Sequence, residues 1–213
     1  MELTIDIEVI PNLDTAAIEE LSAGVQAPGQ YKKPESIAEW LAENRQRIVD
    51  EQVHKSCFAG ETGQIICIGW AFEDQEPVAL TGSEASILAG FFAGVAKLSN
   101  GQVLDVIGHN VSFDVRYIWQ RAVINGIKPP WNIKWQGKAW DYKDTMALWH
   151  PAQDKKISLE KLCKALGVQT SKGDLDGSKV LDYFKAGKID EIATYCKADV
   201  IATRQCYWKM MFR

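Results

Sequence analysis

The stretch TIDIEVIPN, residues 4–12, decides the fold class and poses the question of function. Its apolar residues alternate with polar ones, which is the period-two pattern of a β-strand. Asp6 and Glu8 stand two residues apart and therefore point to the same face of that strand. Strands are poor in Asp, and like charges on one face repel each other. Either this face is simply solvated, or the two carboxylates are placed together to act together.

The rest of the chain alternates strands with helices and ends in helices. The elements expected from periodicity and turn residues are a helix within 11–24, a helix over 35–53, a hairpin over 64–82, a helix over 83–101, a strand over 102–110, a helix over 112–127, a strand beginning the segment 141–149, and helices at 158–168, 178–187 and 188–211. This order predicts an α/β fold, a sheet packed by helices with a helical C-terminal third.

Composition limits the classes of protein that fit. With 213 residues, 46% of them hydrophobic, the chain can bury one substantial core and is expected to form a single domain over 1–213. The net charge of −4 excludes binding of nucleic acid through bulk positive charge, although metal ions can neutralise acids at a local site. Five cysteines without CxxC spacing favour buried thiols in a reducing compartment.

The sequence also predicts a protein that does not enter a membrane. The start, MELTIDIE, lacks a basic region followed by an apolar run, and the longest apolar stretch, 87–96, is too short to span a bilayer. A cytoplasmic location is therefore expected.

Two further segments carry acids in suggestive places. In GHNVSFDVRYI, residues 108–118, Asn110 follows a buried strand and Asp114 lies in the first turn of a helix, where an ordinary N-terminal acid would also be favoured by the helix dipole. In YCKADVIATRQCY, residues 195–207, Tyr195 and Asp199 share one face of a helix. Taken alone, they could be a partly exposed tyrosine beside a surface acid.

Taken together, the three motifs form an ordered set that resembles the DEDD superfamily of 3′–5′ exonucleases, which have the ribonuclease H-like (DnaQ-like) fold. The set is Asp6-x-Glu8, Asn110-x-x-x-Asp114 and Tyr195-x-x-x-Asp199. The tyrosine four residues before the last Asp is the mark of the DEDDy branch. The histidine branch has His five residues before that Asp, where this chain has Thr194.

The resemblance extends beyond the acids. The stretches 158–168 and 172–200 are similar to the predicted exonucleases related to the proofreading domain of family B DNA polymerases, and the likeness runs from Thr4 to about Tyr207. It implies a mixed sheet flanked by helices. The roughly 50 residues between the first strand and the hairpin are longer than in compact proofreading domains, so about 12–56 is expected to be an insert.

The implied activity is metal-dependent 3′–5′ hydrolysis of DNA, with single strands preferred and nucleoside monophosphates released. Two alternatives stay open: an exonuclease on RNA or short oligonucleotides, and an inactive nucleic-acid-binding module on the same fold. The expected partner is the nucleic acid itself, with a separate polymerase or another replication or repair protein as a further partner. The sequence does not separate DNA from RNA, because recognition of the 2′-hydroxyl leaves no readable pattern here.

The chemistry explains why four acids would be grouped. Two Mg²⁺ or Mn²⁺ ions about 3.5–4 Å apart can activate water and neutralise the phosphoryl oxygens, and such ions take oxygen ligands. Without them, two carboxylates some 4 Å apart repel by roughly 4 kcal/mol at an effective dielectric near 20.

By resemblance, the four acids hold these ions, with Asp6 bridging both, Glu8 and Asp199 on the ion beside the nucleophile, and Asp114 on the other. Tyr195 would orient the attacking water, because a phenol with a pKa near 10 is a poor base at neutral pH. Asn110 would contact the substrate.

The segment 128–140, KPPWNIKWQGKAW, holds three lysines and three tryptophans. Such a segment could stack bases and neutralise phosphates of a single strand. Equally, the tryptophans could belong to the core and the lysines to solvent.

Overall fold

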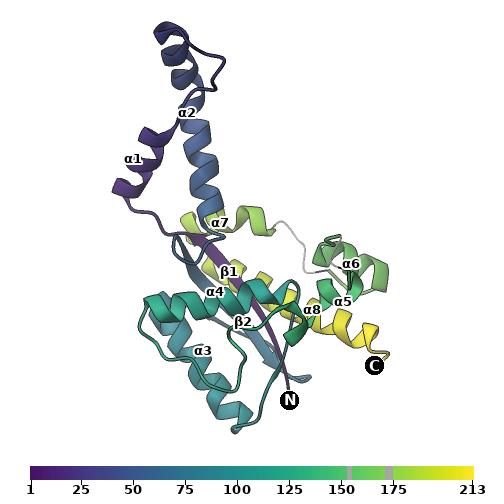
Figure 1. Ribbon diagram of the computed structural model, residues 1–213. Helices are drawn as coiled ribbons and strands as arrows, with labels where there is room; N and C mark the ends of the chain where they lie inside the picture. The colour runs from purple at the N-terminus through teal and green to yellow at the C-terminus, as the bar shows by residue number, and fades with distance from the viewer. Residues whose placement is uncertain (153–154, 171–174) are drawn as a thin grey trace. The chain divides into compact units, whose positions relative to one another are not determined.

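The computed structural model describes residues 1–152, 155–170 and 175–213 (Figure 1). These residues form two compact units, Met1–Val9 with Ile65–Arg213, and Ile10–Gln64, which we call the sheet unit and the helical unit. Within the stretch 172–200 cited above, residues 172–174 lie outside the described residues.

The described residues form a mixed sheet of five strands in the order β3-β2-β1-β4-β5. The strands are β1 (Glu2–Pro11), β2 (Gly63–Phe72), β3 (Val78–Thr81), β4 (Asp105–Gly108) and β5 (Lys143–Asp144). β1 runs parallel to β4 and β4 parallel to β5, whereas β2 and β3 pair antiparallel as the expected hairpin. The α/β prediction is confirmed, and the mixed sheet is consistent with the ribonuclease H-like fold.

The parallel register defines one functional edge of the sheet. Glu2 is opposite Asp105 and Thr4 is opposite Ile107, so Asp6 lies level with the residues that follow β4. We call the edge where β4 and β5 end the carboxyl edge. Side chains from the end of β4, from the start of the next helix and from the middle of β1 therefore meet there.

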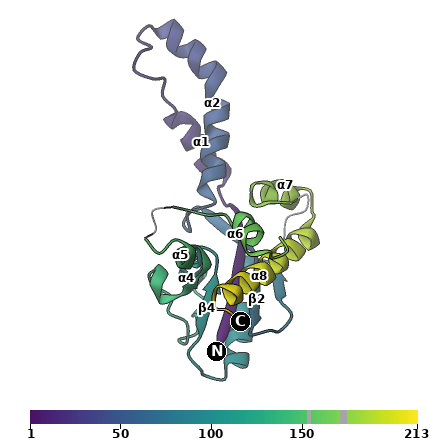
Figure 2. The same cartoon turned by 90° about the vertical axis from the view of Figure 1, so that its right-hand side faces the viewer.

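Helices cover both faces of the sheet (Figures 1 and 2). α3 (Glu84–Ser99) and α4 (Val111–Ile124) pack on the face formed by the odd-numbered residues of β1, and α8 (Ile189–Met210) crosses the other face. The remaining helices of the sheet unit are α5 (Thr145–Trp149), α6 (Leu159–Leu166), α7 (Val180–Lys185) and the short 3-10 turns η1 (Ala139–Asp141) and η2 (Gly177–Lys179). The helical C-terminal third is as predicted.

The strand expected over 102–110 is shorter than its apolar pattern indicates. α3 ends at Ser99, and Asn100 takes a left-handed conformation (φ 47°) that reverses the chain before Gly101. Gln102 then bonds back to the Ser99 carbonyl, so β4 begins only at Asp105. The turn uses residues that the sequence pattern assigns to the strand.

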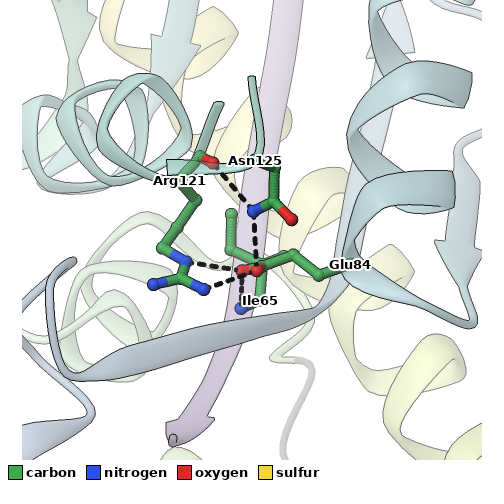
Figure 3. Close-up of polar contacts among 4 residues, drawn as sticks. All are labelled: Ile65, Glu84, Arg121 and Asn125. Carbon is green, nitrogen blue, oxygen red and sulfur yellow. Dashed lines mark hydrogen bonds and ion pairs between the residues drawn. The ribbon is translucent and has the colours of Figure 1, made fainter. Parts of the chain in front are cut away.

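A buried ion pair joins two helices to the sheet (Figure 3). Glu84, the first residue of α3, accepts from Arg121 of α4 through Nε at 2.8 Å and Nη2 at 2.6 Å. It also accepts from Asn125 Nδ2 at 2.9 Å and from the Ile65 N–H of β2 at 2.8 Å. Burial opposes ionisation of Glu84, but these donors hold its pKa below the usual value. The carboxylate thus fixes α3, α4 and β2 at one point.

The helical unit contains α1 (Thr15–Gly24) and α2 (Pro34–Ser56). Asp14 caps α1 by accepting from the Ala17 N–H at 2.8 Å. Pro34 opens α2, where its missing N–H costs nothing. In the described part of the chain, no helix is both long and apolar enough to cross a membrane.

Candidate active site

β1 presents Asp6 and Glu8 to α8 rather than to water. The odd-numbered side chains of the strand lie in the core with α3 and α4, so the even-numbered ones face the opposite side of the sheet. Glu8 is only 7% exposed, and the Sγ of Cys196 in α8 lies 3.3 Å from the Asp6 Oδ2. A solvated strand face is therefore the wrong explanation for this pair.

Asp114 and Asp199 complete an acidic cluster with Asp6 and Glu8. Asp114 is buried in the first turn of α4, and its Oδ1 accepts from the Ile7 N–H at 3.2 Å, which ties the helix to β1. Asp199 is buried in α8, one turn after Tyr195. The surface-acid explanation is therefore wrong for Asp199, which is buried, whereas Asp114 does lie in the first turn of its helix, as an ordinary helix-start acid would.

Burial and mutual repulsion raise the pKa values of three of these acids, Asp6, Glu8 and Asp114. The pKa of Asp6 is well above its usual range because of burial and then the charges of Asp199, Glu8 and Asp114. The pKa of Glu8 is raised by burial and then by Asp199. Burial raises the pKa of Asp114 to about 8, although N–H donors, including that of Ile7, oppose the rise. Carboxylates that repel in this way fit a site for cations, since a bound cation lowers the cost of their ionisation.

The donor set also fits the type of ion expected. Among the described residues, one group of potential ligands consists of Asp6, Glu8 and Cys196, whose ligand atoms all lie within 4.8 Å of one another. Together with Asp114 and Asp199, the cluster is dominated by carboxylate oxygens, which are the ligands that Mg²⁺ and Mn²⁺ prefer.

Tyr195 lies in α8 beside this cluster. Its pKa is raised by burial, then by the charges of Asp199 and Glu8, and by its hydrogen bond with Asp199. The phenol therefore keeps its proton at neutral pH. In this position Tyr195 can donate a hydrogen bond or orient a water molecule, but it is unsuited to act as a base.

Asn110 is placed at the carboxyl edge but is not part of the acidic cluster. It adopts a left-handed conformation (φ 62°) before α4, and its N–H donates to the Asp144 Oδ1 at 2.9 Å. Asn110 also lines a pocket of about 130 Å³. The structure thus places Asn110 beside Asp144.

Sequence reasoning missed Cys196 and Asp144. Cys196 donates to Asp6, and the only signal for it is its i, i+3 spacing to Asp199 on the helix. Asp144 ends β5, caps α5 by accepting from the Met146 and Ala147 N–H groups, and adds negative charge near Asp114. An Asp at the junction of a strand and a helix was the available signal.

The comparisons with known proteins agree with this geometry. A family model described as a predicted 3′–5′ exonuclease related to the exonuclease domain of PolB matches residues 39–213. A search of curated proteins finds no significant match. The family match includes Asp114, Tyr195 and Asp199 but begins after β1. Three contacts join β1 to the matched region: its pairing with β4, the Cys196 thiol on Asp6, and the Ile7 N–H on the Asp114 carboxylate.

Proposed function

The chain belongs to this family of predicted 3′–5′ exonucleases, and we propose that it hydrolyses phosphodiester bonds at the 3′ end of DNA, preferring single strands and releasing nucleoside monophosphates. The observation that supports this best is the cluster of four acids from β1, α4 and α8, in which Glu8, Asp114 and Asp199 are buried and Asp6 is half-buried. A module that only binds nucleic acid would gain nothing from carboxylates that repel both one another and phosphate.

Asp6, Glu8, Asp114 and Asp199 would hold two divalent ions, Mg²⁺ or Mn²⁺. Ions of this kind, when bound, lower the pKa of a water molecule and neutralise charge on the phosphoryl oxygens. The protonated Tyr195 hydroxyl orients the attacking water, and Asn110 contacts the substrate at the carboxyl edge. The Cys196 thiol and the Ile7 N–H hold the carboxylates of Asp6 and Asp114 in place.

The proposal extends to the whole chain. Residues 1–213 would form one exonuclease domain, with about 12–56 inserted between β1 and β2. This division keeps Asp6 and Glu8, which lie near the start of the chain, in the same domain as Asp114 and Asp199. A partner such as a separate polymerase or repair protein would deliver the 3′ end.

A degradation assay tests the activity. A 5′-labelled single-stranded DNA and a matched RNA are incubated with Mg²⁺, with Mn²⁺ and with EDTA, beside the variant Asp6→Ala. We expect a metal-dependent ladder that shortens from the 3′ end and is absent in Asp6→Ala. Asp105→Ala is the matched control, because Asp105 is also an acid on a sheet strand but is exposed at the opposite end of β4.

The outcomes separate the alternatives. A ladder with RNA but none with DNA would show that the substrate is RNA and not DNA. Binding of both strands without a ladder under any metal would instead favour the inactive module. Near-normal cleavage by Asp6→Ala would remove the acidic cluster from the mechanism.

A further inference from the structure

The Lys/Trp segment 128–140 is divided by the fold into three parts with different surroundings. Trp135 belongs to the core: its ring centroid lies 5.4 Å from that of Phe92, and its Nε1 donates to the Pro130 carbonyl at 2.6 Å. Trp131 and Trp140 are 75% and 71% exposed. The explanation in which all three tryptophans are core residues is therefore wrong for two of them.

The two exposed tryptophans lie near opposite ends of β4. The neighbour of Trp131, Asn132, accepts from the Leu104 N–H at 3.1 Å, and Leu104 precedes β4. The neighbour of Trp140, Ala139, lines the pocket that contains Asn110, which follows β4. Only Trp140 is therefore at the carboxyl edge, where the acidic cluster also lies.

Hydrogen bonds within the loop flank Trp140 on both sides. The Lys138 N–H donates to the Asp141 Oδ2 at 2.7 Å, and the Gly137 N–H donates to the Tyr142 hydroxyl at 2.9 Å. Lys138 Nζ lies 5.0 Å from the centroid of the Trp140 ring, which adds a cation beside the aromatic surface. We call the exposed Trp140 ring, with Lys138 beside it, the platform.

The pocket beside this platform is small and cationic. It measures about 130 Å³, and its lining includes Asn110, Ser112, Asp144, His150, Lys155 and Lys156. Pockets for drug-sized ligands have volumes of roughly 300–1,000 Å³, so this one suits a phosphate or a sugar and is too small for a whole nucleotide.

The charges that line the pocket complement a phosphate. Lys155 and Lys156 are exposed, and His150 adds a third basic side chain. Among the described residues that line the pocket, Asp144 is the one acid, and its Oδ1 already accepts three backbone N–H groups, those of Asn110, Met146 and Ala147. In a chain whose net charge is −4, this concentration of basic side chains at the carboxyl edge marks a site for an anion.

The segment with the two lysines is held against the sheet. His109, which follows β4, bonds the Ile157 carbonyl and the Thr145 hydroxyl through its two ring nitrogens, each at 2.8 Å. Burial lowers the pKa of His109, so these bonds come from a largely neutral ring at neutral pH. The residue that follows Lys156 is therefore fixed to the same edge that carries Asn110 and Ser112.

We propose that the carboxyl edge carries a track for the single strand on the 5′ side of the scissile bond, with a backbone phosphate in the pocket beside Lys155 and Lys156 and a base stacked on Trp140. This inference rests on the proposed function, because that function supplies the strand. Bases of any sequence stack on an aromatic ring, and lysines neutralise phosphates without reading sequence. The track therefore predicts binding that is strong for single strands and tolerant of sequence.

Binding is measured separately from cleavage. The probe is a fluorescein-labelled oligothymidine, with an oligouridine beside it, titrated with the full chain in Ca²⁺ and checked by gel to be intact. We expect Trp140→Ala to weaken binding about tenfold and Trp140→Phe to restore most of the affinity. Trp131→Ala, which removes a similarly exposed tryptophan from the same loop, should leave the affinity unchanged.

The lysines are tested through the salt dependence of binding. For single strands, the slope of log affinity against log salt falls by about 0.7 for each phosphate contact that is lost. The variant Lys155→Ala/Lys156→Ala should therefore have a slope shallower by about that amount. Lys32→Ala/Lys33→Ala is the matched control, since it removes an adjacent exposed lysine pair and the same charge.

Several outcomes would overturn the track. These are a wild-type chain that binds no single strand, equal effects of Trp140→Ala and Trp131→Ala, or equal salt slopes for the two lysine pairs. The two failures are distinguishable. If the chain shows the expected binding pattern but gives no cleavage ladder, the proposed track stands and the proposed activity is wrong.

Discussion

Cys196 donates its thiol hydrogen to Asp6, with Sγ 3.3 Å from Oδ2 and 3.5 Å from the main-chain oxygen. The contact joins α8 to β1 at the acidic cluster. Gly69 of β2 makes the approach possible, because a Cβ at that position would lie 2.7 Å from the Cys196 Sγ and 3.2 Å from the Cys196 carbonyl oxygen. The helix that carries Tyr195 and Asp199 therefore packs as closely as a glycine allows.

Gly69→Ala is expected to displace α8 from the sheet. The new methyl group overpacks the contact with Cys196, which costs about 1–3 kcal/mol of unfolding free energy. Cleavage should fall as well, because Tyr195 and Asp199 move with the helix. Urea denaturation and the 3′ degradation assay measure the two effects.

Two controls test whether the contact with Cys196 causes the loss of stability in Gly69→Ala. Gly24→Ala is the matched variant, because a Cβ there meets nothing within 4 Å, and we expect no loss of stability. The double variant Gly69→Ala/Cys196→Ala should recover part of the loss, since the thiol that meets the new methyl is gone. Strictly additive losses in the two single variants would show that this contact is not responsible.

The metal-free protein is expected to lose stability as pH rises. The pKa of Asp114 is about 8 in the fold against a usual value of 3.8, so between these limits the folded state binds the proton that the unfolded state has lost. Stability falls with pH wherever the folded state binds more protons, so this contribution is lost progressively from about pH 4 to about pH 8. Burial and repulsion act in the same direction on Asp6 and Glu8.

Metal binding should reverse this trend. Thermal unfolding is followed in EDTA and in Mg²⁺ at about pH 5 and at about pH 8, and the increase in melting temperature with Mg²⁺ should be larger at the higher pH, where the ligands must ionise. Asp114→Asn should flatten the pH dependence measured in EDTA. An equal Mg²⁺ effect at both pH values would contradict a cation site built from these acids.

The parts of the site that the sequence predicts are those with a local period. Asp6 and Glu8 share a face because strands alternate, and Tyr195 and Asp199 share one because they are four apart in a helix. The periodicity of a strand does not show which element packs on each of its faces. Only the packing of α8 on β1 reveals that Cys196 donates to Asp6.

Contacts between distant segments are beyond such patterns. The ion pair of Glu84 and Arg121 spans 37 positions, and its partners lie on different helices. In the Lys/Trp segment, composition alone does not predict which of Trp131, Trp135 and Trp140 is buried. The fold buries one against Phe92 and exposes the other two near opposite ends of β4.

Tyr195→Phe should slow cleavage by about 10- to 100-fold without loss of metal affinity. The phenol keeps its proton because burial raises its pKa. On the proposed role, the substitution removes a hydrogen-bonding group that would orient water, and it removes no metal ligand. Calorimetric titration with Mn²⁺ and the pH dependence of the cleavage rate check the role. Weakened Mn²⁺ binding, or loss of one limb of the pH profile, would show that Tyr195 acts as a ligand or as a base.

Glu84→Ala is expected to destabilise the protein by about 3–5 kcal/mol, because it leaves the Arg121 guanidinium buried without its carboxylate. The Ile65 N–H and the Asn125 amide lose an acceptor at the same time. Urea denaturation measures the cost. Asp105→Ala breaks the exposed pair with Lys143, 3.7 Å apart, and should change the stability by less than about 0.5 kcal/mol. Comparable costs for the two variants would mean that the buried carboxylate does not fix α3 and α4 to β2.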